Sequence, residues 1–259
     1  MKLKFPKFIP FLLSVNIDDS LLCKNIIYKD GETELEGYLC SDQSIKTKRP
    51  GVVVVHEWNG IGDHVKMRCR KLAQLGYVAF AADIYGKGIR PTTFEEASKQ
   101  ASGFRSNRPL MRKRANLALE EIRKNEFVDN KNIAAMGYCF GGGVALELAR
   151  SGADINGAIC FHGNLDTPNP DDAKNIKGKI LICHGADDKA VTFDSMTKFI
   201  DEMKNSGINY EIDIYGGAVH AFTNPNSGSD PSRGVAYNRQ ADERSWQKMN
   251  DFFKEIFNN

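Results

Sequence analysis

The chain has 259 residues and a formal net charge of +2, with 35 basic residues against 33 acidic ones. This length suits a single α/β domain, and the near-even charge without a long basic run excludes the usual pattern of a nucleic-acid-binding protein. The six cysteines are scattered, and because none forms a Cys-x-x-Cys pair, the common zinc and thioredoxin-type motifs are excluded as well. We expect all six to be reduced thiols, which indicates a cytoplasmic protein.

The chain begins with a short stretch that stands apart from the rest. Two lysines precede an apolar run at residues 8–15, which Pro10 interrupts. The run is too short to span a membrane, and no small-residue cleavage site follows it. We predict an N-terminal extension at residues 1–24 and a single domain at residues 25–259. Export through a weak N-terminal signal is the alternative to a cytoplasmic location, and no stable membrane association is expected.

A β-hairpin is predicted at the start of the domain. Residues 25–29 and 33–39 have strand character, and the Asp30-Gly31 turn between them is typical of a hairpin. The next strand, residues 51–56, is almost entirely apolar, as expected where a strand is buried on both faces of a parallel sheet. The hairpin should therefore add antiparallel strands at one edge of a mostly parallel sheet.

Beyond residue 51, predicted strands and helices alternate. The further strands are expected at residues 78–82, 133–136, 158–161, 180–184 and 210–215. The helices are expected at about residues 63–75, 115–122, 141–150, 194–205 and 246–256. This alternation predicts a three-layer α/β fold, with helices on both faces of the sheet. Two longer stretches are expected to be irregular and to line a site, residues 86–108 and 223–234.

A nucleophile elbow is indicated by Gly137-Tyr138-Cys139-Phe140-Gly141, with Cys in place of the more usual Ser. A predicted strand precedes this motif and a predicted helix follows it, as the motif requires. Cys139 would then lie at a helix N-terminus, where the helix dipole favours a thiolate. The alternative interpretation is a buried thiol beside glycines that only serve packing.

A cysteine nucleophile needs a base and an acid that orients the base. His220 comes just after the last predicted strand, and Asp188 comes just after the strand that ends at His184. The order Cys, Asp, His is that of the α/β-hydrolase triad, and all three residues follow the carboxyl ends of parallel strands. Asp187 is the alternative acid, although we prefer Asp188 because the turn after Gly185 should direct the later residue inward.

Two backbone N–H groups are predicted to stabilise an oxyanion, those of Phe140 and Trp58. Glu57 precedes Trp58 in the same loop, and a carboxylate near a thiolate is unfavourable unless one of the two holds a proton. The alternative for Glu57 is an ordinary surface charge.

Other side chains near strand ends complete the predicted site. The pocket is expected to be walled by Trp58, Tyr85, His162 and Phe222. His56 and His184 also end strands, and we interpret them as structural. His64, at the start of a helix, is expected to be exposed.

Four stretches of the sequence resemble the dienelactone hydrolase family of α/β-hydrolases, and the similarity extends from about residue 25 to the C-terminus. The stretches are Val55-His56-Glu57-Trp58-Asn59-Gly60, Ala82-Asp83-Ile84-Tyr85-Gly86, Gly137-Tyr138-Cys139-Phe140-Gly141-Gly142 and Val219-His220-Ala221-Phe222. The resemblance implies an α/β-hydrolase fold without a large cap domain, and a triad of Cys139, His220 and Asp188.

The resemblance also implies a reaction, the hydrolysis of an enol-lactone that carries a carboxylate, without metal or organic cofactor. In this family the glutamate that matches Glu57 meets the nucleophilic cysteine in the resting enzyme, until substrate displaces it. Two arginines that bind the substrate carboxylate are replaced here by Lys87 and Asn224. A lysine still attracts an anion but lacks the planar fork of an arginine, so Lys87 is our candidate for substrate binding.

The sequence thus predicts a hydrolase that cleaves small ester or lactone bonds through a thioester on Cys139. Its expected partner is a small-molecule substrate, with no nucleic acid, and the oligomeric state is left open. Two alternatives stay open. One is a thiol redox protein in which Cys139 is oxidised to a sulfenic acid. The other is a binding module that keeps the fold without activity.

Overall fold

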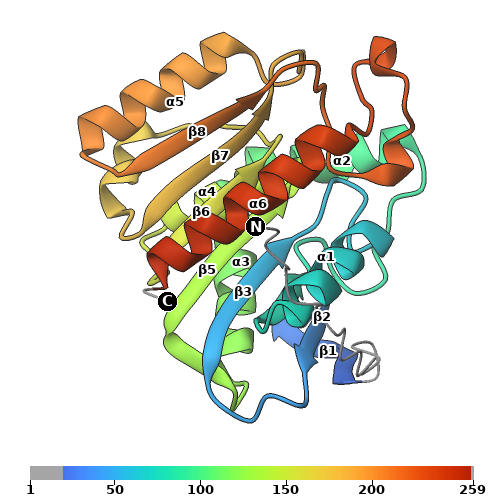
Figure 1. The fold of residues 1–259 in the computed structure, drawn as a ribbon, viewed down its shortest axis with the longest axis vertical. Helices are drawn as coiled ribbons and strands as arrows, with labels where there is room; N and C mark the ends of the chain where they lie inside the picture. Colours follow the sequence, from blue (N-terminus) through green and yellow to red (C-terminus); the bar gives the residue numbers. More distant parts are fainter. Residues whose placement is uncertain (1–19, 258–259) are drawn as a thin grey trace, which may run out of the picture.

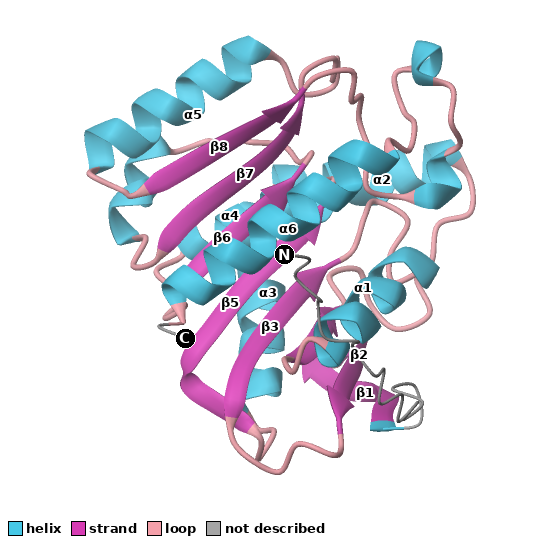
Figure 2. Cartoon of the chain, in the orientation of Figure 1, coloured by secondary structure: helices cyan, strands magenta, loops and turns pink. Residues whose placement is uncertain are grey.

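The computed structural model describes residues 20–257, and it contains one eight-stranded sheet (Figures 1 and 2). The strand order is β1-β2-β4-β3-β5-β6-β7-β8. The bounds are β1 (Leu21–Asp30), β2 (Thr33–Asp42), β3 (Arg49–Val55), β4 (Val78–Ala82), β5 (Val128–Tyr138), β6 (Gly157–Phe161), β7 (Lys179–Gly185) and β8 (Tyr210–Tyr215). β1 with β2 and β2 with β4 are antiparallel, and all other pairs are parallel. The predicted sheet with an antiparallel edge is confirmed, although β1 begins at Leu21, within the stretch that we expected to precede the domain.

Helices cover both faces of the sheet, which confirms the three layers (Figure 2). They are α1 (Asp63–Gln74), α2 (Phe94–Ser106), α3 (Arg108–Arg123), α4 (Phe140–Arg150), α5 (Phe193–Ser206) and α6 (Arg239–Ile256). The loops contain the short 3₁₀ helices η2 (Pro170–Asn175), η3 (Pro225–Ser227) and η4 (Pro231–Arg233). Among residues 20–257, none of the helices is long and apolar enough to cross a membrane.

The apolar sequence of β3 follows from burial on both faces. Successive side chains of a strand point to opposite faces. Val53 and Val55 accordingly join the hydrophobic core beneath α3 and α4, whereas Val52 and Val54 join the core beneath α1 and α6. A strand with two buried faces must be apolar throughout, which is why the sequence of this segment indicated a central strand.

Helix α2 was not predicted, because we expected residues 86–108 to be irregular. Thr93 begins the helix with a capping box. Its hydroxyl accepts a hydrogen bond from the Glu96 N–H, and the Glu96 carboxylate accepts one from the Thr93 N–H. Only Ala97, Ala101 and Phe104 are buried on this helix. Two alanines and one phenylalanine give a weak apolar stripe, so periodicity alone does not reveal the helix.

Two expectations about polar residues are wrong. The structure joins Cys23 to Cys40 as a disulfide between β1 and β2, whereas we expected six reduced thiols. These two residues are directly opposite in the antiparallel register, which the sequence spacing alone does not reveal. His64 is buried rather than exposed, because α1 packs its first turn against Tyr138.

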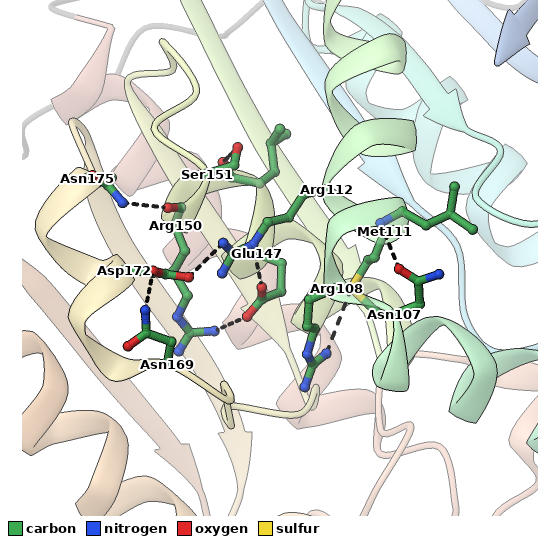
Figure 3. A network of polar contacts seen from close by, with 12 residues as sticks. Asn107, Arg108, Met111, Arg112, Glu147, Arg150, Ser151, Asn169, Asp172 and Asn175 are labelled. Carbon is green, nitrogen blue, oxygen red and sulfur yellow. Dashed lines mark hydrogen bonds and ion pairs between the residues drawn. The ribbon is translucent and has the colours of Figure 1, made fainter. Parts of the chain in front are cut away.

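A buried ion-pair network fixes the far end of α4 to its neighbours (Figure 3). Glu147 of α4 accepts hydrogen bonds from Arg150 at 3.0 Å and from Arg112 of α3 at 2.8 Å. Arg150 also binds Glu202 of α5 through two hydrogen bonds of 2.7 and 2.8 Å. Since α4 begins directly after Cys139, this network holds the helix on which the predicted nucleophile depends.

Candidate active site

Cys139 lies in a tight turn between β5 and α4. Its φ is +54°, a left-handed conformation that costs energy for a residue with a side chain. The flanking glycines make the turn possible, because a Cβ on Gly137 would lie 2.0 Å from the Gly141 carbonyl oxygen and one on Gly141 would lie 2.3 Å from the Val55 carbonyl oxygen. Cys139 is only partly buried. The strained turn therefore presents the sulfur at the end of the sheet to which β5, β6, β7 and β8 all point (Figure 1).

The structure brings Cys139, His220 and Asp188 together. His220 Nε2 lies 3.1 Å from Cys139 Sγ, and His220 Nδ1 lies 2.8 Å from Asp188 Oδ2. The other carboxylate oxygen, Asp188 Oδ1, accepts hydrogen bonds from the N–H groups of Ala190 and Val191 at 2.8 and 3.1 Å. Asp187 is exposed to solvent. The geometry therefore favours Asp188 over Asp187 as the acid that orients the histidine.

The charges of these groups reinforce one another. Burial alone would lower the pKa of His220, but the Cys139 sulfur and the Asp188 carboxylate outweigh it and raise the pKa to about 10. Burial alone would raise the pKa of Asp188, but the hydrogen bonds from His220, Ala190 and Val191 lower it below its ordinary value. At neutral pH the arrangement favours an imidazolium between the sulfur and a carboxylate.

His162 lies behind Cys139 and does not line the cavity, contrary to our expectation. Its Nδ1 lies 3.2 Å from the Cys139 backbone nitrogen and its Nε2 lies 2.8 Å from Thr223 Oγ1. Burial and the neighbouring His220 lower the pKa of His162 well below its ordinary value, so the ring is neutral. Nδ1 then accepts from the Cys139 N–H, and Nε2 donates to Thr223. The ring thus connects the nucleophile turn to the loop that carries His220.

Tyr85 and Phe222 also support the site from beneath. Both are buried, and neither is among the residues that line the cavity. The Tyr85 hydroxyl donates to the Trp58 carbonyl oxygen at 2.9 Å, which fixes the loop after β3. The ring of Phe222 packs edge-on against His162, with 5.1 Å between ring centroids. Of the four residues predicted to wall the pocket, only Trp58 faces it.

A cavity of about 370 Å³ lies in front of Cys139. Its walls come mainly from loops after the strands, together with one residue of α2. They are Glu57, Trp58, Asn59, Arg105, Cys139, Asn164, Ala190, Val191, His220, Ala221, Asn224, Ser227 and Val235. Asn164 follows β6, so the rule that placed the other residues at strand ends could have found it. Arg105 was missed because its helix was not predicted.

Lys87 does not reach this cavity. Its ammonium group pairs with Glu34 Oε2 at 2.8 Å, and its backbone N–H donates to the Glu34 carbonyl oxygen, also at 2.8 Å. The turn after Tyr85 therefore directs Lys87 toward the β1–β2 hairpin. Arg105 supplies the cation in the cavity instead, with its guanidinium 6.0 Å from the centroid of the Phe140 ring.

Glu57 is buried, so it is not an ordinary surface charge. Its Oε2 accepts a hydrogen bond from the Asn224 amide at 2.7 Å, and His64 Nδ1 lies 3.4 Å from the same oxygen. The sulfur of Cys139 contacts His220 rather than Glu57. The resting contact between this glutamate and the cysteine, which the resemblance implies, is therefore not the arrangement in this structure.

The family model described as the dienelactone hydrolase family matches residues 35–257. The chain belongs to the dienelactone hydrolase family. A protein of Saccharolobus solfataricus with the provisional name carboxymethylenebutenolidase is 26% identical over 269 residues, which cover 90% of this chain and 98% of that protein. The class of reaction of this family member is ester or lactone hydrolysis.

Solved structures of the family agree with the fold. The structure named m3DLH has 37% sequence identity and a TM-score of 0.89, over 92% of this chain and 99% of that one. The dienelactone hydrolase-like promiscuous phosphotriesterase P91, from metagenomic libraries, has 38% identity and a TM-score of 0.87 over the same shares. Within residues 20–257, no group of three or more His, Cys, Asp or Glu side chains is arranged to hold a metal ion.

Proposed function

We propose that this dienelactone hydrolase family member cleaves its ester or lactone through a thioester on Cys139, with His220 as the proton carrier and Asp188 as its orienting acid. The contacts of 3.1 Å from sulfur to Nε2 and 2.8 Å from Nδ1 to Oδ2 support this most directly. A protonated imidazole beside a sulfur stabilises the thiolate, which is the reactive form of the nucleophile.

The reaction has two halves. The Cys139 thiolate attacks the carbonyl carbon, the carbon–oxygen bond to the leaving group breaks, and the leaving oxygen takes the proton from His220 Nε2. This leaves a thioester and a neutral imidazole. His220 then removes a proton from water, which attacks the thioester carbonyl and breaks the carbon–sulfur bond. The acid is released, and the thiolate and imidazolium are restored.

Backbone N–H groups of Phe140 and Trp58 are proposed to stabilise the oxyanion in both halves. Phe140 is the first residue of α4, so its N–H has no acceptor within the helix. The loop that carries Trp58 is fixed by the hydrogen bond from the Tyr85 hydroxyl. Donors that are held in place before the reaction stabilise a developing charge without further reorganisation.

Arg105 favours a substrate with an acidic group. Arg105 lines the cavity, and its guanidinium has no ion-pair partner among residues 20–257, whereas most buried or half-buried arginines in that range do. A carboxylate accepts two parallel hydrogen bonds from a guanidinium. A cavity of about 370 Å³ admits only a small molecule. We therefore assign Arg105 the role that we first expected of Lys87.

The catalytic assignment is tested with p-nitrophenyl acetate as a small ester. Cys139→Ala and His220→Ala should each slow turnover by about 10³-fold or more, since members of a triad act as a unit. Cys183→Ala is the matched control, because Cys183 is a buried thiol in β7 that lies outside the cavity. Turnover by Cys139→Ala at the rate of the unaltered protein would refute the mechanism. Mass spectrometry of the quenched reaction should show an acyl group on Cys139.

The substrate assignment is tested by comparing a neutral ester with the same ester carrying a carboxylate. Arg105→Ala should raise KM for the acidic ester about tenfold or more and leave KM for the neutral one nearly unchanged. Lys87→Ala, which removes an exposed cation outside the cavity, should change neither. If Arg105→Ala and Lys87→Ala changed KM for the acidic ester equally, the assignment of Arg105 as the carboxylate-binding residue would be refuted.

A phosphotriester is a second substrate class to include, because the relative P91 is named a promiscuous phosphotriesterase and is 38% identical to this chain. The same Cys139 and His220 variants identify whether any such activity uses the same site. Peroxide-dependent labelling of Cys139 without ester hydrolysis would favour the redox alternative instead.

A further inference from the structure

Glu57 places a carboxylate in the wall of the cavity that contains the Cys139 sulfur. A carboxylate close to a thiolate raises the free energy of the thiolate, because like charges repel. The chain must therefore either move this charge away or keep one of the two groups protonated. The contacts around Glu57 show which of these the structure favours.

Two groups lie against the same oxygen of Glu57, and one of them is hydrogen-bonded to it. The Asn224 amide donates to Oε2 at 2.7 Å, and His64 Nδ1 lies 3.4 Å from it. Asn224 follows His220 in the same loop, and His64 is in the first turn of α1. Both groups also line a second cavity of about 310 Å³ that shares Glu57 with the first one. Asn224 lines the first cavity as well, so the hydrogen-bonded oxygen is held where the two cavities meet.

His64 is itself fixed with its donor toward Glu57. Its Nε2 accepts a hydrogen bond from Arg68 Nε at 3.1 Å, so the neutral ring carries its proton on Nδ1. That Nδ1 is buried and makes no hydrogen bond within residues 20–257. Arg68 is held in turn by Asp242 at 2.5 Å and by the Thr223 carbonyl oxygen, so the ring has little freedom to turn away.

The charged and titratable groups that surround Glu57 come from several elements, and the buried His56 precedes it directly in the chain. Cys139 faces it from the nucleophile turn, His220 from the loop after β8 and Arg105 from α2. From α1 come His64, Asp63 and, behind them, Arg68. The Asn224 amide donates a hydrogen bond to Glu57 without adding a charge. It can hold the carboxylate without competing with Asp188 for the imidazolium.

We propose that Asn224 and His64 are positioning residues that hold the Glu57 carboxylate off the Cys139 sulfur, so that the proton of Cys139 passes to His220 Nε2 before substrate arrives. This proposal rests on the proposed function of Cys139 and His220. It departs from the resting state that the family resemblance implies, in which the glutamate meets the cysteine until substrate displaces it. In this structure the loop after β8 carries both His220 and Asn224, so the loop that positions the base also restrains the Glu57 carboxylate.

The test measures the state of Cys139 without any substrate. In the full-length protein at neutral pH, Asn224→Ala should reduce the ultraviolet absorbance of the Cys139 thiolate. It should also slow alkylation of Cys139 by iodoacetamide about tenfold, which corresponds to about 1.4 kcal/mol. Asn226→Ala is the matched control, since it removes the same kind of amide two residues later on the loop, and within residues 20–257 no hydrogen bond joins the Asn226 side chain to Glu57. It should react at the rate of the unaltered protein.

A second background separates positioning from a merely structural role. In Glu57→Gln the repelling charge is gone, so adding Asn224→Ala should no longer slow alkylation. Asn224→Asp keeps the oxygen that accepts from the Asn226 N–H and replaces only the donor, and it should slow alkylation at least as much as Asn224→Ala. His64→Ala should act in the same direction with a smaller effect.

Either of two results would overturn the proposal. One is an unchanged alkylation rate in Asn224→Ala and Asn224→Asp. The other is that Asn224→Ala slows alkylation as much in the Glu57→Gln background as it does in the unaltered protein. Failure of the proposed function is a separate result, because it requires ester hydrolysis to persist in Cys139→Ala, whereas alkylation does not depend on turnover. Thermal unfolding of each variant checks that a slower rate does not come from lost structure.

Discussion

Replacing Asp188 with Asn should abolish most of the activity without moving the side chain. Asp188 Oδ1 accepts from the N–H groups of Ala190 and Val191. In Asp188→Asn these two donors select the amide oxygen for that place, which leaves the NH₂ group facing His220 Nδ1. Since an NH₂ group donates, Nδ1 must accept, and the proton of the neutral ring moves to Nε2. The nitrogen that faces the Cys139 sulfur then cannot take up a proton.

The expected loss is about 10⁴-fold in kcat, the effect of a wrong tautomer in other triads, or about 5.5 kcal/mol at 1.36 kcal/mol per tenfold. The loss of the carboxylate should also lower the pKa of His220 from about 10 toward its ordinary value. Steady-state hydrolysis of p-nitrophenyl acetate measures the first effect, and NMR titration of the imidazole measures the second. The first effect follows from the two backbone donors, and the second follows from the lost charge of Asp188.

Asp187→Asn is the matched control, because Asp187 is adjacent in sequence but exposed. It should retain full activity. If Asp188→Asn kept a rate within about twofold of the unaltered protein, or if the loss appeared in Asp187→Asn instead, the assignment of the acid would be wrong.

Three further outcomes test the turn, the core and the protonation of the base. Gly141→Ala should leave little folded protein in circular dichroism, because its Cβ would lie 2.3 Å from a backbone oxygen, whereas Gly216→Ala, with no atom within 4 Å, should fold normally. Glu202→Gln should cost about 1.5–3 kcal/mol in urea unfolding, since it leaves the buried Arg150 guanidinium with Glu147, a carboxylate that it shares with Arg112, while the exposed Asp194→Asn should cost less than about 1 kcal/mol. The pKa of His220 is raised to about 10, so its protonated form is present below that pH and is lost above it. Leaving-group protonation, measured with an alkyl ester, should therefore decline as pH rises through about 10.

The sequence predicted the order of the strands, and of the helices other than α2, because the apolar pattern and the burial of each strand have the same cause. It also predicted that Cys139, Asp188 and His220 would lie at one edge, because parallel strands place their carboxyl ends together. The position of the strand ends does not decide between Asp187 and Asp188 as the orienting acid. It depends on which side chain receives the N–H groups of Ala190 and Val191, a detail of one turn that periodicity does not describe.

The errors concern side chains whose surroundings are made by distant parts of the chain. Lys87 was expected in the cavity, but Glu34 of the hairpin, 53 residues earlier, takes its charge. Arg105 enters the cavity from a helix whose buried face is too small to show in the sequence. His64 is buried by its packing on Tyr138 and by Arg68, which binds a carbonyl group 155 residues later in the chain. In each case the partner, not the residue type, determines the position.

The distance between sulfur and imidazole is set by contacts that no single segment contains. His162 accepts from the backbone N–H of Cys139 and donates to Thr223, three residues after His220. Arg68 binds the carbonyl oxygen of the same Thr223, while the next residue, Asn224, binds Glu57. The nucleophile turn, the loop after β3 and the loop after β8 therefore position one another through buried polar groups. Because an unsatisfied buried group is costly, a displacement of the His220 loop would break several of these contacts at once, which restricts the imidazole to the place where it meets the sulfur.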